Sequence, residues 1–470
     1  MSRSMPQNEA LLKEVEALLA CHRGLFKQER VYQRVVDLVY GEVMCLGRHT
    51  VTQVAWTLGE NESDISAYYR VWSEERFDAA GSAEVMLEES LKHVSSEEVY
   101  VVVGDGTQTP RTGRHMPGTS WLRNPRTPAF KVGIHRAQRW FNGCWLTPPE
   151  AGYSRAIPLK WLPAFPEKAA GDEFPACKEW AAGLDFLRWV RQGLDERGRA
   201  EQPLLMLVDG SFDTTGLWQG LPARTVVMAR SAKNRVLHHP LPPDAHGNRK
   251  RGPRAPTPQQ VWQRRGNWSK VTLTVRGRQR RLQYRVRGPL FRPQAPDTPL
   301  FLLVVRGQTY QKNKRYKYRK PVPYLVNAVQ DARGRWRLPL DAKTLIFWAW
   351  QRWEIEVCHR ELKSNLGLGD KQAWSPAAAI ATVQWSAWVY SLLMLAAYRT
   401  WGLTHGPPVP TRWWRGSGRW SFNTLWRSIR AALWATPRFY PGRDPTTHNL
   451  GGNLSRVPTL PYAVHAATPL

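Results

Sequence analysis

The sequence predicts an α/β protein with a mixed sheet, preceded by helices and interrupted by a basic, β-rich stretch. Three observations lead to this fold class. Residues 8–46 carry apolar side chains at helical spacing, and from residue 98 short, apolar, β-branched runs begin. A helical pattern at 177–197 separates two groups of such runs, and strands alternating with helices are typical of a helix-covered sheet. Residues 246–320 are again strand-like but strongly basic.

The charge balance of the chain indicates a polyanionic partner. Its 470 residues contain 67 Lys and Arg against 38 Asp and Glu, a formal net charge of +29. Nucleic acid is the first candidate partner and an anionic membrane surface the second. The cysteines are odd in number and dispersed, which favours a reducing compartment without a disulfide framework. They are Cys21, Cys45, Cys144, Cys177 and Cys358.

Residues 49–73 carry the pattern of two short helices. Val51 and Val54 precede a break at residues 59–61, after which Ser63 can cap a new helix that includes Ile65 and Tyr68. A helix-turn-helix and a plain helical hairpin both fit this pattern. The N-terminus is polar and charged, so no signal peptide is expected.

Two aspartates share one sequence context. The strand expected from the apolar run 98–103 should end at Asp105, and the strand expected from the run 203–208 should end at Asp209. Each aspartate is followed by glycine. Further strands are expected at 130–147, 154–163 and 224–231. Neighbouring strand ends can bring two carboxylates together, and close carboxylates repel unless a proton or metal intervenes. Hard divalent ions prefer such oxygen ligands, although Asp-Gly is also common in ordinary turns.

The basic stretch is expected to form a β-rich module on a phosphate backbone. Residues 246–320 contain 21 Lys and Arg and a single acid, Asp297. Aromatic residues, among them Trp262 and Trp268, are interleaved with the cations, which is typical of nucleic-acid surfaces. A solvated basic surface is the alternative interpretation.

One long helix is expected at 341–366, with Asp341 as its N-cap. At about 100° per residue, Arg352, Glu356 and Lys363 share a face, whereas Glu354 points away. Such a face is either an intrahelical salt-bridge ladder or a site where the acid holds a metal and the cations hold phosphates. The uncharged run 376–398 is long enough to cross a bilayer, but a buried core helix is preferred because the run contains Gln384 and many Ala, Ser and Thr residues.

The Arg-x3-Glu-x6-Lys pattern resembles the signature of a group of bacterial insertion-sequence DDE transposases, Tyr-x2-Arg-x3-Glu-x6-Lys. Arg352, Glu356 and Lys363 match it, Trp353 matches the written-out form RWxIExxFxxLK, and Ala349 stands where the family has the Tyr that contacts DNA phosphates. Asp105-Gly106-Thr107, Asp209 and the segment 228–237 (MARSAKNRVL) also look like that family.

The resemblance implies an RNase H-like catalytic core interrupted by a β-rich insertion. It implies that Asp105, Asp209 and Glu356 are the catalytic ligands of two Mg²⁺ ions, for which Mn²⁺ can substitute. It further implies a DNA transposase that cleaves transposon ends and joins them to target DNA, acting as a homodimer in the DNA complex. A hairpin at the transposon end, with a flipped base stacked on Trp262 or Trp268, is frequent in the family. The expected DNA contacts are Arg352, Lys363, Arg230, Lys233, Trp262, Trp268, Arg249, Lys250 and Arg251.

The expected domain organisation follows these boundaries. Residues 1–95 form a helical DNA-binding domain, 96–240 and 326–400 the two parts of the catalytic core, and 241–325 the basic insertion. Residues 401–470 serve dimerisation or DNA contact. We expect a cytoplasmic, nucleoid-associated protein without a membrane partner. The rival interpretations are a catalytically idle regulator derived from a transposase, a structure-selective nuclease of the same fold, and a membrane-associated basic protein.

Overall fold

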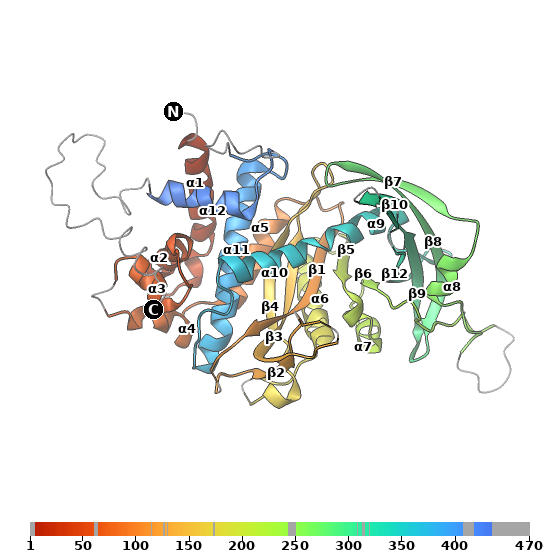
Figure 1. Cartoon of the computed structure of the whole chain (residues 1–470), viewed down its shortest axis with the longest axis horizontal. Coiled ribbons are helices and arrows are strands. Elements are labelled where there is room, and N and C mark those ends of the chain that lie inside the picture. The colour runs from red at the N-terminus through yellow and green to blue at the C-terminus, as the bar shows by residue number, and fades with distance from the viewer. Residues whose placement is uncertain are drawn as a thin grey trace.

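The computed structural model confirms a mixed α/β architecture built on one large sheet (Figure 1). It describes residues 5–434 except 61–63, 114, 126, 129, 173, 243–250, 308, 313, 314, 319 and 408–417. The sheet has ten strands, and its principal path runs β2-β3-β1-β5-β6-β12-β9-β8-β7, with β4 paired to β3.

The centre of the sheet combines antiparallel and parallel pairing. β1 (Tyr100–Pro110) lies antiparallel to β3 (Ile134–Leu146), which also pairs with β2 (Thr119–Arg123) and β4 (Ala156–Pro163). On its other side β1 is parallel to β5 (Leu204–Val208), and β5 is parallel to β6 (Thr225–Arg230). All five residues of β5 are buried, as expected of a parallel strand covered on both faces.

The strands of the basic segment extend this same sheet. β12 (Val322–Asn327) joins β6 to β9 (Ala295–Arg306), followed by β8 (Arg278–Arg292) and β7 (Ser269–Val275), all antiparallel. Beside them lie α8 (Pro258–Gln263) and two small pairs of strands. These pairs are β10 (Thr309–Lys312) with β11 (Arg315–Tyr318), and β13 (Val329–Gln330) with β14 (Trp336–Arg337).

Residues of β1 alternate between two helix-covered faces. On one face α6 (Glu179–Glu196) approaches so closely that a Cβ added at Gly106 would lie 2.3 Å from Oε1 of Glu179. On the other face Lys363 of α10 (Glu354–Asn365) donates to Thr107, two residues beyond Asp105. Figure 1 shows α10 crossing in front of β1. Asp105 and Thr107 therefore share the face that α10 covers.

The helix expected at 341–366 is two helices, so that prediction was wrong in its continuity. α9 (Ala342–Gln351) begins at Asp341, whose carboxylate accepts the Thr344 N–H at 3.0 Å as expected of an N-cap. The helix is interrupted at residues 352–353, and α10 begins at Glu354 with short-range bonds such as Glu356 N–H to Trp353 carbonyl. Arg352 and Trp353 keep right-handed helical backbone angles, so the interruption does not change which face carries Glu356.

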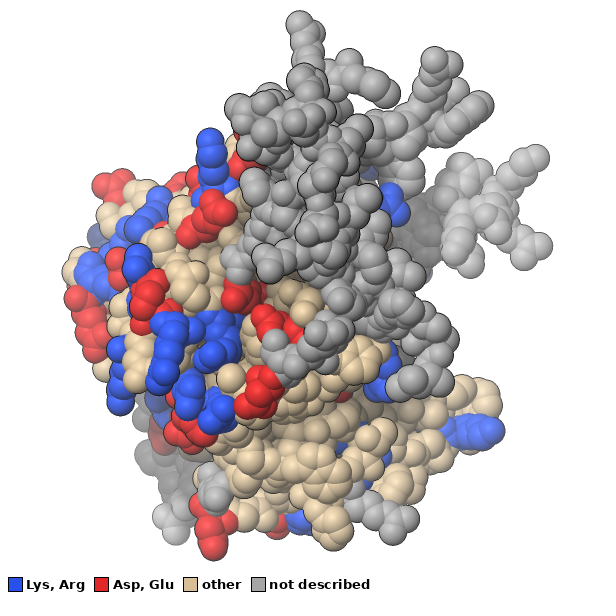
Figure 2. All heavy atoms as spheres, turned by 90° about the vertical axis from the view of Figure 1, so that its left-hand side faces the viewer, with Lys and Arg blue, Asp and Glu red and all other residues tan. Residues whose placement is uncertain are grey.

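The N-terminal helices pack on the C-terminal ones. α1 (Met5–Cys21), α2 (Glu29–Met44), α4 (Ser66–Ser73) and α5 (Ala79–Leu91) contact α11 (Pro376–Trp401) or α12 (Phe422–Trp434), and they share one hydrophobic core with the sheet. α3 (Val51–Thr57) and α4 are the two short helices expected at 49–73. Ser63 lies outside the described residues, and α4 begins one residue after Ile65. Figure 2 faces this side of the molecule and shows cations interspersed with acids.

α11 is the buried core helix expected from the run 376–398. It is long and apolar enough to cross a membrane, but 89% of its apolar window is buried inside the protein. Ser375 caps its start by accepting the Ala378 N–H, and Gly402 ends it with a φ of 62°. Protein side chains thus occupy the surface that a membrane span would present to lipid. The short helix α7 (Thr215–Gln219) follows β5 and contacts α6 and β9.

Candidate active site

Asp105 lies within β1 and not at its end. The expectation that the strand stops at this residue was wrong, because β1 continues to Pro110 along its antiparallel partner β3. The parallel pairing with β5, in contrast, stops at Val103. Asp105 therefore stands just beyond the point where the pairing of β1 with β5 ends, and its Oδ2 lies on the α10 side of the sheet, 3.7 Å from Nη1 of Arg352.

Asp209 follows β5 directly, as expected. Its Oδ1 accepts the backbone N–H of Ser211 at 2.7 Å and the hydroxyl of the same residue at 2.6 Å, which caps a short 3-10 turn. The turn leads to Asp213, a fully buried carboxylate that binds Arg235 at 2.6 Å and Arg292 at 2.5 Å. These two ion pairs anchor the loop that carries Asp209 to β8 and to the segment after β6.

Glu356 completes the group from the α10 side. Its Oε1 lies 2.6 Å from Nη2 of Arg352, and Nη1 of the same guanidinium lies 3.7 Å from Oδ2 of Asp105. Arg352 thus spans the two carboxylates. Lys363 donates to the Thr107 hydroxyl at 2.7 Å, so both cations expected on this helix face are present beside β1.

Glu354 is directed elsewhere, as the helical geometry predicted. Its Oε1 pairs with Arg276 at 2.7 Å, in the turn between β7 and β8. It therefore ties α10 to the basic part of the sheet and takes no part in the carboxylate group.

The electrostatics of the site show that both of the other acids act on Asp105. Burial, the charge of Asp209 and, more weakly, the charge of Glu356 together raise the pKa of Asp105 to about 7. Arg352 and the Gly106 N–H oppose this rise without cancelling it. A carboxyl with a raised pKa among further acids is typical of a functional site.

A fourth acid was missed by the sequence analysis. Glu179, the first residue of α6, packs against Gly106 and pairs with Nε of Arg139 at 2.9 Å. Burial raises the pKa of Glu179, Arg139 lowers it, and Asp209 raises it again. Glu179 therefore lies beneath the site on the α6 face. No local pattern links it to Asp105, so only the fold could reveal it.

The remaining residues expected to contact DNA are spread over a wider surface. Arg230, at the end of β6, and Lys233 are exposed. Tyr324 pairs with Arg230 across strands. Burial raises the pKa of Tyr324, and the charges of Arg352 and Arg230 lower it. Tyr324 was also missed from the sequence. It places a tyrosine near Arg352, whereas the tyrosine position of the signature is occupied by Ala349.

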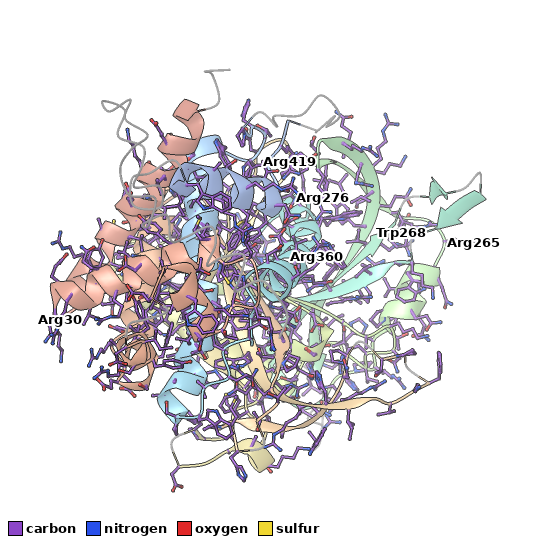
Figure 3. All side chains as sticks on the ribbon, turned by 60° about the vertical axis from the view of Figure 1, so that its left-hand side comes forward. Arg30, Arg265, Trp268, Arg276, Arg360 and Arg419 are labelled. Atoms are coloured by element: carbon purple, nitrogen blue, oxygen red, sulfur yellow. The ribbon has the colours of Figure 1, made fainter. Side chains whose placement is uncertain are left out.

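The two tryptophans proposed as base stackers belong to the basic part of the sheet. Trp262 lies in α8, and Trp268 precedes β7 with the guanidinium of Arg285 over its ring at 4.3 Å. Both are packed partly against the core. Figure 3 shows Trp268 and Arg265 on the side of the molecule away from Arg30 of α2. Arg251 is exposed, whereas Arg249 and Lys250 lie outside the described residues.

The donor set suits a hard divalent cation. Asp105, Asp209 and Glu356 offer only carboxylate oxygens, and their mutual repulsion is the kind that a divalent ion relieves. Among the described residues, no three His, Cys, Asp or Glu side chains are grouped closely enough to enclose one ion. In this arrangement Glu356 is turned onto Arg352, so a cation at Asp105 and Glu356 would compete with that guanidinium for the same oxygens.

Comparison with known proteins identifies the class to which this fold and site belong. The family model described as DDE superfamily endonuclease matches residues 24–289, more than half of the chain. The chain therefore belongs to the DDE superfamily endonucleases. The matched range contains Asp105 and Asp209 and ends before Glu356, and the grouping of the three acids rests on the geometry described above.

No curated protein matches the chain. Among solved structures, it is similar to piggyBac transposase in a synaptic complex with hairpin DNA, with 10% sequence identity and a TM-score of 0.37. That alignment covers 94% of this chain and 80% of the other. A TM-score this low does not equate the two folds.

Proposed function

We propose that this protein is a DNA transposase that cleaves transposon ends and transfers the freed strands into target DNA. The observation that carries the proposal is the coupling of Asp105 to Asp209 and Glu356, with Arg352 spanning two of the three carboxylates. Membership of the DDE endonuclease family supports a nuclease. The order β4-β3-β1-β5-β6, three antiparallel strands followed by two parallel ones, supports an RNase H-like core.

The carboxylates would hold two Mg²⁺ ions, with Mn²⁺ able to substitute. Bound there, the ions would supply an activated nucleophile and stabilise the leaving oxygen of a phosphodiester. Because its pKa is about 7, Asp105 is only partly ionised at neutral pH, and a bound cation would favour the ionised form. Arg352, once released from Glu356, is free to bind a phosphate in bidentate fashion, and Lys363 beside Thr107 presents a second cation on the same face.

The DNA partners follow from charge and position. Transposon-end and target DNA would lie across the α10 side of the sheet and the basic strands β7 to β9, with α3 and α4 reading the end sequence. A homodimer would bring two ends together, with residues 401–470 taking part. A cytoplasmic, nucleoid-associated location belongs to the same proposal.

The test is cleavage of the element's own ends by the purified full chain. We expect cutting with Mg²⁺ or Mn²⁺ and none in EDTA. Glu356→Gln should abolish cleavage while leaving end binding intact. Glu354→Gln is the matched control on the same helix: it loses the pair with Arg276 and some thermal stability, but it should still cut. Undiminished cutting in EDTA, or by Glu356→Gln, would refute the proposed site.

A catalytically idle regulator is the alternative that the same experiment excludes or supports. It would bind ends and show no cleavage under any metal condition. A structure-selective nuclease would cut branched DNA equally well whether or not it carried the element's end sequence.

A further inference from the structure

An open hollow lies at the far end of β1, beyond the catalytic carboxylates. Its volume is about 870 Å³, within the range of small-molecule and nucleotide sites. The end of β1, the β2–β3 hairpin, the loop before α3 and the loop after α10 form its walls. The side chains that matter are Arg48, Arg111, Trp121, Ile134, Arg136 and Asp370.

The strand register places this hollow on the same sheet face as Asp105. Thr109, four residues beyond Asp105 in β1, is opposite Gln138 of β3, which is opposite Thr119 of β2. Two residues further along each of these strands, Arg136 is opposite Trp121. Because side chains alternate along a strand and paired residues share a face, Asp105, Trp121 and Arg136 project from one face.

The distance along β1 suits a short stretch of nucleic-acid strand. Pro110, which lines the hollow, is five residues from Asp105, or roughly 17 Å at about 3.4 Å per residue. A stacked strand covers that distance in about five nucleotides at roughly 3.4 Å each. Lys363, bonded to Thr107, lies between the two points.

The lining combines aromatic surface with positive charge. The side chain of Trp121 is 58% exposed and that of Ile134 is 64% exposed, although both stand on a sheet face that is elsewhere covered by helices. Three arginines line the hollow against a single carboxylate, Asp370. Arg111 is buried and donates to the Lys371 carbonyl at 2.6 Å, so it holds together two segments that line the hollow. Arg48, in contrast, is exposed.

We propose that this hollow binds an unpaired DNA strand that continues from the catalytic carboxylates, with a base stacked on Trp121 and phosphates near Arg48 and Arg136. This inference rests on the proposed function and names the strand path through the same site. An exposed indole beside cations is a stacking platform for single strands, since every base has a π face. The excess of arginine over acid favours a polyanion over a second protein.

The experiment measures binding of a labelled single-stranded 20-mer of thymidine, and of a duplex of the same length, to the full chain in EDTA. We expect Trp121→Ala to weaken single-strand binding about 5- to 100-fold and duplex binding less than about twofold. Trp121→Phe should restore it, since a phenyl ring still stacks. Arg48→Gln should reduce the slope of log affinity against log salt by about 0.7.

Trp336→Ala is the matched control, because Trp336 is also exposed, at 38%, but stands on β14 outside the hollow. A loss no larger for Trp121→Ala than for Trp336→Ala would overturn the inference. So would equal losses for single strand and duplex, or a change in self-association with no change in DNA binding. Melting temperatures of the variants guard against misfolding, and failure of Trp121→Phe to restore binding would likewise count against stacking.

The outcome is separable from that of the proposed function because no cleavage is needed. Trp121-dependent binding without metal-dependent cutting would leave the strand site standing and refute the transposase. Cutting by a protein whose Trp121→Ala variant binds single strands normally would do the reverse.

Discussion

The Nη2 atom of Arg352 lies 2.6 Å from Oε1 of Glu356. Its other terminal nitrogen lies 3.7 Å from Asp105, so one guanidinium pairs with two of the three acids at the site. The break between α9 and α10 falls at residues 352–353, between the arginine and its partner.

Replacing Arg352 should impair the handling of DNA more than the binding of metal. We expect Arg352→Ala to slow cleavage about 100-fold, the scale of losing one preorganised donor, with partial rescue at higher DNA concentration. Arg352→Lys should rescue poorly, because a point charge cannot span two carboxylates as a planar fork does. Single-turnover rates measured across DNA concentrations test this. A lysine variant as active as the native protein would show that charge alone suffices.

The raised pKa of Asp105 predicts how activity depends on pH. The pKa of Asp105 is about 7, so at lower pH the carboxyl holds a proton that a divalent cation must displace. Cleavage at fixed, subsaturating Mg²⁺ should therefore fall about tenfold per pH unit below 7 and level off above it. A rate profile from pH 5.5 to 9 measures this, and a flat profile through pH 7 would contradict it.

The same shift makes a prediction about stability. Because the folded pKa lies above the ordinary value of 3.8, the folded state binds the extra proton, and without metal its stability falls as pH rises from about 4 to 7. Added Mg²⁺ should raise the melting temperature more at pH 8 than at pH 6. Asp105→Asn, which has no proton to lose, should remove that difference.

Several parts of the site could be predicted from the sequence because their signals are local. The five apolar residues of β5 lead directly to Asp209. A strand buried on both faces is continuously apolar, so it can be recognised in the sequence. Helical spacing alone separated Glu356 from Glu354, which the structure directs to Arg352 and Arg276 respectively.

Other parts could not be predicted because they depend on pairing between distant segments. β1 runs past Asp105 because β3, some thirty residues later, continues to bond with it. Glu179 reaches Gly106 only through the packing of α6 on the sheet. The interruption after α9 contains neither Pro nor Gly, so no residue type in the sequence predicts it.

The buried aspartate behind Asp209 should matter for the shape of the site. Asp213→Asn removes the charge that holds Arg235 and Arg292, leaving two guanidinium groups short of a partner. We expect a cost of about 3–5 kcal/mol in unfolding free energy and a loss of cleavage in the surviving folded protein, since the Asp209 loop loses its anchor. Denaturant unfolding and cleavage are the measurements. Asp185→Asn, whose pair with Arg188 is exposed, is the control and should change neither.

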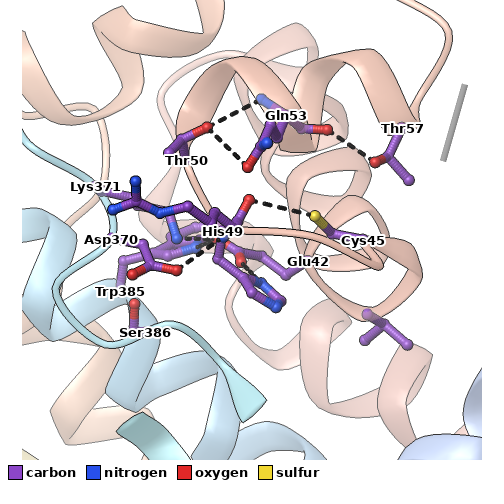
Figure 4. Close-up of polar contacts among 12 residues, drawn as sticks. Glu42, Cys45, His49, Thr50, Gln53, Thr57, Asp370, Lys371, Trp385 and Ser386 are labelled. Atoms are coloured by element: carbon purple, nitrogen blue, oxygen red, sulfur yellow. Dashed lines mark hydrogen bonds and ion pairs between the residues drawn. The ribbon is translucent and has the colours of Figure 1, made fainter. Parts of the chain in front are cut away.

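A second buried cluster joins the N-terminal helices to the rest of the chain (Figure 4). Glu42 of α2 lies 2.5 Å from Nζ of Lys371, accepts from Trp385 of α11 at 3.0 Å and contacts Nδ1 of His49 at 2.8 Å. Burial by itself would raise the pKa of Glu42, but Lys371 and His49 together lower it to about 2. Three segments far apart in sequence thus meet at one carboxylate.

Glu42→Gln should loosen that junction. It leaves the ammonium of Lys371 buried without its counter-charge, for which we expect a loss of about 3–5 kcal/mol. Glu42→Gln combined with Lys371→Met should recover part of the loss, because no unpaired charge remains. Since the pKa of Glu42 is depressed, the stability that its ionised carboxylate contributes is present above about pH 4.5 and is lost as pH falls towards 2. Urea unfolding at pH 7 and pH 3 should therefore show a smaller difference between native and Glu42→Gln proteins at the lower pH.

Glu29→Gln, which breaks an exposed pair with Arg23, is the control and should cost less than about 1 kcal/mol. A double variant no more stable than the single one would mean that the cluster is held by packing and not by the ion pair.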